Sequence, residues 1–401
     1  MSPLEQARDL FFAGVAAYEA GRHADAEQHF IAALGLVPGR PSVLVNLAAT
    51  RIKLGRAAEA IEALEQAAAA EPPGADALHH HATALAMLGR EAAALELNER
   101  ALALAPRHAA PLMLKGQLLQ ALGRPADALA AYETLLDADA THAAAWSQRG
   151  MILKDMGRLA DAAQCFRQAL AHGAGDTALV ELNRYMLASV DGGAEVPAQA
   201  PRAYVEGLFD SYAEGFDEHL TGKLGYRTPQ RLHALLPAAR RYAAALDLGC
   251  GTGLMAPLLA PLADALDGVD LSSLMLEKAR ALGRYRHLVH ADVAEHLHAT
   301  GERYALVAAA DVFVYVGALD AVFAGTARVL DAGGLFLFSV EEATAQELEL
   351  RPSSRYAHSE ACVRRLAAAC GFVVRRIERA ALRQDQGRPV MGLACLLERG
   401  D

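Results

Sequence analysis

The stretch Ala245-Leu246-Asp247-Leu248-Gly249-Cys250-Gly251-Thr252-Gly253 decides the fold of the second half of the chain. An apolar run typical of a buried strand passes into a turn with three alternating glycines, and a helical pattern follows over residues 254–262. Glycines in such a turn let the backbone approach a ligand at the carboxyl end of a strand. The spacing D-x-G-x-G-x-G differs from the dinucleotide pattern G-x-G-x-x-G, and the Lys-Ser/Thr pair of a P-loop is missing.

Strand-like and helical segments alternate around this turn. Besides residues 245–249, apolar runs cover residues 265–270, 286–292, 304–311, 334–341, 372–378 and 390–398. Helical patterns lie between them, near residues 273–283, 318–330 and 359–370. This alternation predicts a Rossmann-like α/β domain with a doubly wound, mostly parallel sheet of seven strands. Because no helix separates the last two runs, we expect the final strand to form an antiparallel hairpin.

An acidic residue stands at the end of each of four consecutive predicted strands. These residues are Asp247, Asp270, Asp292 and Asp311. A carboxylate at the end of the second strand can accept hydrogen bonds from both hydroxyls of a ribose. A single aspartate at such a position is more often a helix cap or a turn residue. Four of them in order along one sheet edge indicate a ligand site.

The first half of the chain repeats itself every 34 residues. Glycines recur at this spacing, as Gly21, Gly55, Gly89, Gly123 and Gly157. Each is followed five residues later by an alanine: Ala26, Ala60, Ala94, Ala128 and Ala162. Four residues further on stand Phe30, Leu64, Tyr132 and Phe166, with Asn98 as the exception. Glycine permits a tight turn between two helices and alanine lets them approach closely, so the period predicts stacked helix–turn–helix units.

This pattern resembles the tetratricopeptide repeat, with five repeats that begin at residues 7, 41, 75, 109 and 143. Residues 177–190 form one more amphipathic helix, which we expect to cap the array, so that an all-α solenoid spans residues 7–190. Residues 191–201 are rich in Gly, Pro and Ala and are predicted to be a linker. A second domain then covers residues 202–399.

The resemblance implies a concave groove in the array. Its positions in this sequence are Phe11, Val15, Tyr18, Val45, Ile52, His79, Met113, Gln117 and Lys154. Such grooves bind a protein or peptide, and the alternative is that the array packs on its own catalytic domain. His79, His80 and His81 are adjacent, and adjacent helical side chains diverge by about 100°. They cannot share one metal ion, and we expect no metal site.

The second half resembles the class I S-adenosylmethionine-dependent methyltransferases over residues 202–399. The resemblance implies S-adenosyl-L-methionine as cofactor and S-adenosyl-L-homocysteine as product. It implies that Asp247 and the loop of Gly249, Cys250, Gly251 and Gly253 approach the methionine and ribose, and that Asp270 holds the ribose. It further implies that Leu271 and Met275 flank the adenine, that Asp292 and the Val293 backbone read its edge, and that Asp311 lies by the methionine end.

Residues 209–220, Phe-Asp-Ser-Tyr-Ala-Glu-Gly-Phe-Asp-Glu-His-Leu, carry a further resemblance. Together with the repeats they resemble a bacterial family of predicted tetratricopeptide-repeat methyltransferases, whose catalytic half opens with F-D-x-Y-A-x-x-F-D-x-H-L. In many methyltransferases such a helix covers the cofactor. Phe209, Tyr212 and Phe216 are predicted to share one helical face. Tyr212 either faces the sulfonium cation or joins the two phenylalanines in an apolar seam.

The catalytic base is less clear from the sequence. An acceptor O–H or N–H must lose a proton to a positioned group. His358, His219 and Tyr356 are the candidates, and each could instead be a structural residue. The D/N-P-P-Y/F motif of amide- and base-nitrogen methyltransferases does not follow Asp311.

The composition of the chain disfavours several classes of partner and site. The net charge is −10, with 48 acidic against 38 basic residues, which disfavours nucleic acid and acidic membrane surfaces as partners. Five cysteines without a CxxC pair favour neither a disulfide framework nor a zinc site, and we expect a cytoplasmic protein without a signal peptide. We expect a methyltransferase whose O or N acceptor, on a protein, peptide or carrier-bound molecule, is recruited by the array. The alternatives are a small-molecule methyltransferase whose array serves assembly, and a cofactor-binding scaffold without turnover.

Overall fold

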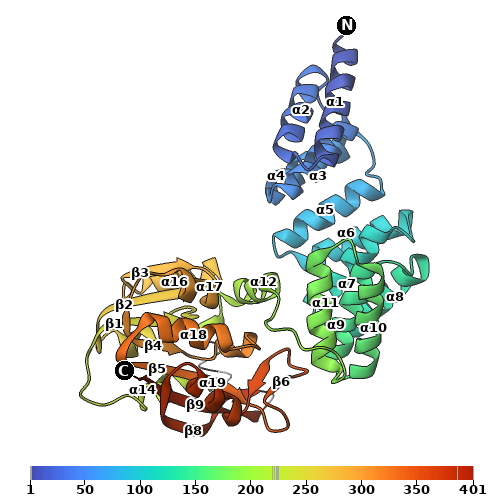
Figure 1. Cartoon of the computed structure of the whole chain (residues 1–401). Coiled ribbons are helices and arrows are strands. Elements are labelled where there is room, and N and C mark those ends of the chain that lie inside the picture. The colour runs from blue at the N-terminus through green and yellow to red at the C-terminus, as the bar shows by residue number, and fades with distance from the viewer. Residues whose placement is uncertain (1, 219, 221, 223–224, 386, 401) are drawn as a thin grey trace. The chain divides into compact units, whose positions relative to one another are not determined.

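The computed structural model describes residues 2–218, 220, 222, 225–385 and 387–400 of the chain (Figure 1). It divides into two compact units, Met1–Ala174 and Gly175–Asp401. Within the described ranges, no helix has the length and apolar character needed to cross a bilayer.

The first unit consists of antiparallel helix pairs that stack in sequence order, as the 34-residue period predicts. The helices are α1 (Pro3–Glu19), α2 (His23–Leu36), α3 (Pro41–Lys53), α4 (Ala57–Ala70), α5 (Ala75–Met87), α6 (Glu91–Leu104), α7 (Ala109–Ala121), α8 (Pro125–Ala138), α9 (Ala143–Asp155) and α10 (Leu159–His172). The repeated glycines between paired helices adopt the left-handed conformation, with φ of 73°, 76°, 69°, 69° and 76°. This conformation favours glycine and explains why the turn residue is kept in every repeat.

In three of the repeats the two helices meet at a close contact between a glycine and an aromatic ring. In the first, fourth and fifth repeats a ring on the second helix lies against a glycine on the first. A Cβ at Gly14, Gly116 or Gly150 would come within 2.6, 2.4 or 2.6 Å of the rings of Phe30, Tyr132 and Phe166 respectively. In the third repeat the ring is replaced by buried Asn98, whose side-chain amide donates a hydrogen bond to the Pro111 carbonyl at 2.8 Å. The exception in the sequence pattern is therefore a polar contact to the following repeat.

The second unit is built on a twisted sheet with helices on both faces. Its helices are α11 (Thr177–Val190), α12 (Arg202–Tyr212), α13 (Phe216–Glu218), α14 (Thr228–His233), α15 (Ala256–Leu259), α16 (Ser273–Ala281), α17 (Val293–Ala299), α18 (Asp320–Val329) and α19 (Glu360–Ala369), with the short 3-10 turn η2 (Phe313–Tyr315). Its strands are β1 (Tyr242–Leu248), β2 (Ala263–Asp270), β3 (His287–His290), β4 (Tyr304–Ala309), β5 (Leu330–Glu342), β6 (Leu348–Leu350), β7 (Tyr356–His358), β8 (Phe372–Asp385) and β9 (Arg388–Arg399).

Strand order places β1 between β2 and β4, and β3, β2, β1, β4 and β5 run parallel. The strand order reverses between β1 and β4. Open α/β sheets bind ligands at such a point, beyond the carboxyl ends of the strands. The expected hairpin is present, since β8 pairs with β9 and β9 pairs antiparallel with β5. The predicted Rossmann-like fold class is thus confirmed.

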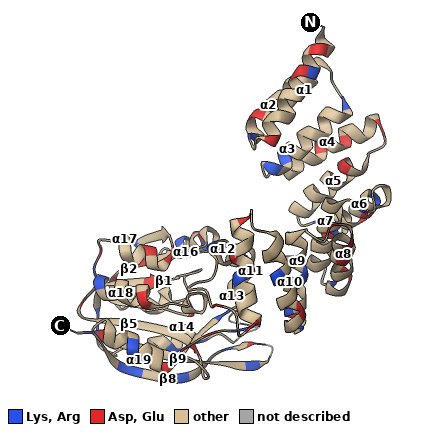
Figure 2. Ribbon diagram, turned by 45° about the vertical axis from the view of Figure 1, so that its right-hand side comes forward, with Lys and Arg blue, Asp and Glu red and all other residues tan. Residues whose placement is uncertain are grey.

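Alternate residues of the central strands enter two different cores, which is why these strands read as continuous apolar runs. Leu246 and Val307 pack with α17, α18 and α19 on one face. Ala245 and Leu306 pack with α14 and α15 on the other. The outer face of β8 is instead charged, as Figure 2 shows, and its arginines pair with glutamates: Arg375–Glu398, Arg376–Glu378 and Arg379–Glu342.

Two features of this unit differ from the sequence prediction. No strand was predicted around His358, but β7 pairs parallel with the end of β5 and antiparallel with β6. The helix α11 was expected to cap the repeats, but the second unit begins at Gly175. Tyr185 of α11 is fully buried there, with ring centroids 5.7 Å from Tyr204 and 5.9 Å from Tyr356. An amphipathic pattern shows that a helix buries one face, but does not show which neighbour covers it.

Candidate functional site

The glycine loop after β1 has a backbone that other residues adopt only with strain. Gly249, Gly251 and Gly253 have φ of 59°, 55° and 94°. A Cβ at Gly249 would lie 2.5 Å from Cγ2 of Val312, whereas a Cβ at Gly251 would meet nothing within 4 Å. The first glycine is therefore required by packing as well as by conformation, and the second leaves open space beside its backbone.

Asp270, the last residue of β2, holds this loop in place. It is 8% exposed. One carboxylate oxygen accepts a hydrogen bond from the Gly251 amide at 2.8 Å, and the other accepts from the Ser272 amide at 2.8 Å. Burial raises the pKa of this carboxyl, and the hydrogen bonds from Ser272 and Gly251 oppose the shift. Each oxygen keeps a second lone pair for a ligand.

Asp247 lies behind the loop and is almost completely buried. Its carboxylate accepts a hydrogen bond from the Tyr285 hydroxyl at 2.7 Å. Burial raises the pKa of Asp247 to about 7, the Tyr285 hydrogen bond opposes this, and the charge of Asp270 adds to it. Neighbouring Cys250 is also buried, and burial raises the pKa of its thiol well above the ordinary value. Cys250 is therefore a packed loop residue, since a thiol of high pKa is a poor nucleophile.

The leading segment of the unit is tied to this loop by its two aspartates. Asp210 accepts a hydrogen bond from the Ser272 hydroxyl at 2.6 Å, and Asp217 accepts one from the Thr252 hydroxyl at 2.5 Å. The phenylalanine before each aspartate, Phe209 or Phe216, lines the same cleft as the glycine loop. The two Phe-Asp pairs of the sequence motif therefore have the same role. In each pair the aspartate forms a hydrogen bond to a hydroxyl near the loop, and the phenylalanine ring lines the cleft.

The aromatic residues of this segment are not arranged as predicted. The helix α12 ends at Tyr212, and Phe216 begins the separate short helix α13, so the three rings share no helical face. Tyr212 is 46% exposed and does not line the cleft. Phe209 packs edge-on against Phe216, with centroids 6.0 Å apart, and against Tyr315 at 5.4 Å. The chain turns at residues 213–215, which the i, i+3, i+7 pattern did not reveal.

One cleft brings together most of the predicted cofactor residues. Those that line it are Asp247, Gly249, Cys250, Gly251, Asp270, Leu271, Asp292, Val293 and Asp311. Asp292 also caps α17, because one of its oxygens accepts from the amides of Ala294 and Glu295. Gly253 and Met275 lie outside the lining. Gly253 packs on Leu282 and Tyr285, and Met275 is fully buried on the inner face of α16.

Two of the three predicted bases, His358 and Tyr356, do not line the cleft. His358 is fully buried in β7, where one ring nitrogen contacts the Gly317 carbonyl at 2.8 Å, and burial lowers its pKa. The Tyr356 hydroxyl donates to the Pro197 carbonyl at 2.8 Å, and burial of this side chain raises its pKa above the ordinary range. Both residues occupy structural positions of a strand that the sequence did not predict. His219 lies outside the described residues.

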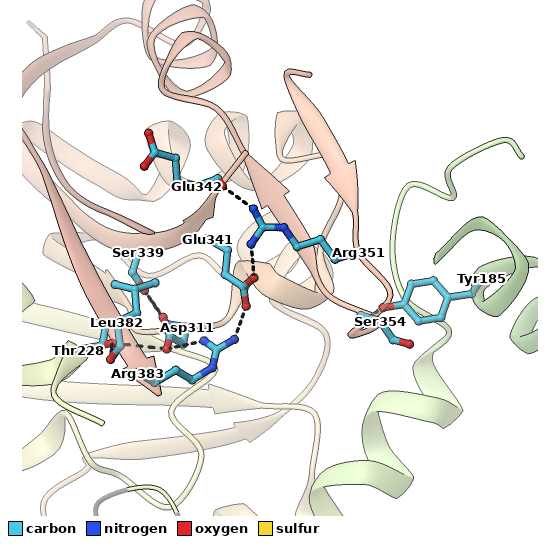
Figure 3. A network of polar contacts seen from close by, with 10 residues as sticks. All are labelled: Tyr185, Thr228, Asp311, Ser339, Glu341, Glu342, Arg351, Ser354, Leu382 and Arg383. Atoms are coloured by element: carbon cyan, nitrogen blue, oxygen red, sulfur yellow. Dashed lines mark hydrogen bonds and ion pairs between the residues drawn. The ribbon is translucent and has the colours of Figure 1, made fainter. Parts of the chain in front are cut away.

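Asp311 follows β4, on the other side of β1 from Asp270 and Asp292, and belongs to an ion network (Figure 3). Its φ of 56° is unusual for a residue with a side chain. Its carboxylate accepts a hydrogen bond from the Ser339 hydroxyl at 2.7 Å and forms an ion pair with the Arg383 guanidinium at 3.3 Å. Arg383 also pairs closely with Glu341, and these two side chains are only 6% and 2% exposed. Glu341 in turn pairs with Arg351 at 3.0 Å.

Several cleft residues escaped the sequence analysis. Tyr226, Tyr315, Arg355 and Arg383 line the cleft but were not predicted as site residues. One signal was present: Glu341 ends an apolar run, and a charged residue in a buried strand needs a partner. The sequence does not say that this partner stands 42 residues later.

Comparison with known families agrees with this architecture. Residues 246–338 match the model of the family described as "Methyltransferase domain", and residues 17–85 and 113–180 match two families described as "Tetratricopeptide repeat". The chain therefore joins tetratricopeptide repeats to a methyltransferase domain.

Curated relatives match part of the chain. It is 41% identical over 86 residues to human methyltransferase-like protein 27, and 40% identical over 110 residues to malonyl-[acyl-carrier protein] O-methyltransferase of Geobacter sulfurreducens. These matches cover 20% and 26% of this chain, and 35% and 41% of those proteins.

Two solved structures show the same partial similarity. Magnesium protoporphyrin IX methyltransferase from Synechocystis PCC 6803 is 19% identical, with a TM-score of 0.39, over 50% of this chain and 99% of that chain. A tetratricopeptide protein of Thermus thermophilus is 26% identical, with a TM-score of 0.39, over 43% of this chain and 94% of that chain.

Proposed function

We propose that this protein transfers a methyl group from S-adenosyl-L-methionine to an O or N acceptor that is carried by a protein, peptide or carrier molecule. The observation that carries the proposal is the pair of hydrogen bonds that Asp270 accepts from the amides of Gly251 and Ser272, both at 2.8 Å. They fix the glycine loop and the end of β2 around one cleft at the reversal point of the sheet. The methyltransferase family match over residues 246–338 supports the same activity.

The lining of the cleft fits this cofactor. Asp270 has lone pairs left to accept from the ribose hydroxyls, and the open space at Gly251 admits the nucleoside close to the backbone. Leu271 and Val293 supply apolar walls for the adenine, and Asp292 stands at its edge. Asp311 lies toward the methionine end, where a carboxylate favours a cation. When bound, the cofactor supplies an activated methyl group, and the chain aligns the acceptor with it.

The leading segment serves this alignment by excluding water. Phe209 and Phe216 form an apolar wall over the cleft, and the tethers from Asp210 to Ser272 and from Asp217 to Thr252 hold that wall in place. A dry site strengthens the electrostatic contacts within it.

The repeats are proposed to recruit the acceptor, because stacked tetratricopeptide units expose an extended surface that a single domain lacks. Gln117 is exposed on α7, at a position that lines the groove in this repeat family. Gln164 is equally exposed on α10, the second helix of its repeat. These two residues give a matched pair of variants.

The test is transfer of labelled methyl from S-adenosyl-L-methionine into an extract of the source cells by the full chain. We expect label in macromolecules, loss of it in Asp270→Ala, and a several-fold reduction in Gln117→Arg but not in Gln164→Arg. Label in small molecules alone would contradict recruitment by the repeats. Cofactor binding without any transfer would contradict the enzymatic activity and favour a scaffold.

A further inference from the structure

Two arginines of the cleft also belong to a second pocket. Arg355 and Arg383 both line the cleft, and both also line a second pocket that contains Glu341, Arg351 and Asp385. The two guanidinium groups therefore stand in the wall between the cofactor cleft and this second pocket.

The two arginines differ in their partners. The guanidinium of Arg383 forms ion pairs with the carboxylates of both Asp311 and Glu341. Arg355 is partly buried beside the Tyr315 hydroxyl, and it forms no ion pair with any carboxylate among the described residues. Burial lowers the pKa of Arg355, but Tyr315 and Glu341 outweigh this and raise it. A desolvated guanidinium that makes no direct ion pair with a described carboxylate can bind an anion.

The backbone that presents Arg355 is held firmly. Ser354, directly before it, is buried with φ of 57°, and the Arg351 amide donates to the Arg355 carbonyl at 2.9 Å. The Tyr185 hydroxyl donates to the Ser354 carbonyl at 2.5 Å, as Figure 3 shows. Because Tyr185 belongs to α11, this helix fixes the turn from which Arg355 reaches the cleft.

Among the described residues of the cleft, the candidates for a base are carboxylates and tyrosines. No histidine or lysine is among those that line it. Asp311 is engaged by Ser339 and Arg383, and burial raises the pKa of Tyr226 far above its ordinary value. An alcohol or a protonated amine would have to lose a proton here, and an ammonium group would also be repelled by the guanidinium of Arg355. A carboxylate needs no base, because it is already ionised at neutral pH.

We propose that the acceptor is a carboxylate, which reaches the cleft from the second pocket, binds Arg355 and is converted to a methyl ester. This rests on the proposed methyltransferase function and names its substrate class. A lone pair of the carboxylate oxygen forms the O–CH3 bond as the S–CH3 bond breaks, the bonding electrons remain on sulfur, and no proton is released. Arg355 is the binding residue, and Arg383, fixed by Asp311 and Glu341, is a positioning residue.

The test uses the full chain with labelled S-adenosyl-L-methionine and two kinds of acceptor. One is an extract of the source cells, separated into macromolecules and small molecules, which distinguishes a carboxylate on a protein or carrier from a free acid. The other is a defined set of octanoate, succinate and glutarate, with octanamide as the neutral match of octanoate. Methyl esters release volatile methanol in mild alkali, whereas N-methyl groups and methyl ethers do not.

Three variants complete the test. Arg355→Gln removes the charge, Arg355→Lys keeps it without the two-pronged geometry, and Arg388→Gln, at an exposed arginine of β9, is the matched control. We expect alkali-labile label, reduced roughly 10- to 100-fold in Arg355→Gln and less in Arg355→Lys, with Arg388→Gln unchanged. Cofactor affinity measured by calorimetry should stay within about twofold in each variant, since the expected loss is in acceptor binding.

The outcomes separate this proposal from the one on which it rests. Alkali-stable label, equal transfer by Arg355→Gln, or bound cofactor with no transfer to extract or defined acids would overturn the carboxylate acceptor. Failure of the wild-type chain to bind S-adenosyl-L-methionine would overturn both proposals together.

Discussion

At one end of the cleft a carboxylate holds backbone amides, and at the other a guanidinium holds carboxylates. Asp270 fixes Gly251 and Ser272, which are 19 and 2 residues away in the sequence. Arg383 fixes Asp311 and Glu341, which are 72 and 42 residues away. The first end shapes a loop around a ligand, whereas the second balances buried charges. We therefore expect substitutions at the two ends to affect stability and ligand binding differently.

The largest effect is expected at the charged end. Arg383→Met leaves Asp311 and Glu341 with less compensation in a buried site, where breaking an ion pair costs about 3–5 kcal/mol. At roughly 2–4 °C per kcal/mol for a unit of this size, the melting temperature of the second unit should fall by about 10 °C. Arg376→Met is the control, because Arg376 pairs with Glu378 on the exposed face of the same strand. Equal shifts in calorimetry would show that the buried network does not stabilise this end.

The glycine loop allows a sharper comparison within the other end. Gly249→Ala combines left-handed strain with a clash 2.5 Å from Val312, whereas Gly251→Ala brings the strain alone. We expect losses of about 2–4 kcal/mol and about 1–2 kcal/mol in the ligand-free protein. The double variant Gly249→Ala/Val312→Ala should recover part of the difference. Chemical denaturation measures all three, and identical losses for the single variants would contradict the packing at Val312.

A pH effect is expected from Asp247, whose folded pKa of about 7 lies above the ordinary value of 3.8. The folded state binds this proton more tightly, so the stability it contributes is fully present below about pH 3.8 and is lost progressively as pH rises from there through 7. Asp247→Asn mimics the protonated form. The excess of its melting temperature over that of the wild type should grow by several degrees between pH 5 and pH 8, since one unit of pKa shift is about 1.4 kcal/mol. A difference that is constant across this range would contradict the buried, proton-binding carboxyl.

The smallest effect is expected from Tyr185→Phe, which removes the hydrogen bond to Ser354. We expect a loss of about 1 kcal/mol in stability and a few-fold rise in the KM for the acceptor, with cofactor affinity unchanged. Tyr242→Phe is the matched control, because the buried Tyr242 hydroxyl has no hydrogen-bond partner in the part of the chain that the structure describes. If both variants behave alike, α11 does not position the Arg355 turn.

The residues at the Asp270 end could be grouped from the sequence, because they lie in one motif and at successive strand ends, and the structure brings them into one cleft. The repeats could be predicted for the same reason, since the turn glycine, the small alanine and the large side chain of each unit lie within one period of 34 residues. The leading segment was only half predicted. Its Phe-Asp pairs were visible, but the break after Tyr212 that places Phe216 on a separate helix was not.

The Arg383 end could not be predicted in the same way. Its contacts join β8 to residues after β4 and β5, and no spacing rule connects them. His358 and Tyr356 suggested catalysis because they lie in a polar segment after β5. That segment becomes β7 only because the end of β5 extends far enough to pair with it, at Glu341 and Glu342. Pairing of this kind depends on the assembled sheet rather than on local pattern.

Calorimetric titration of the full chain with S-adenosyl-L-homocysteine, in the wild type, Asp270→Ala and Arg355→Gln, tests the cofactor site most directly. We expect one site per chain, an affinity at least about 100-fold lower in Asp270→Ala, and a change of no more than about twofold in Arg355→Gln. Binding that survives Asp270→Ala unchanged, or a wild-type chain that does not bind, would contradict this cofactor site.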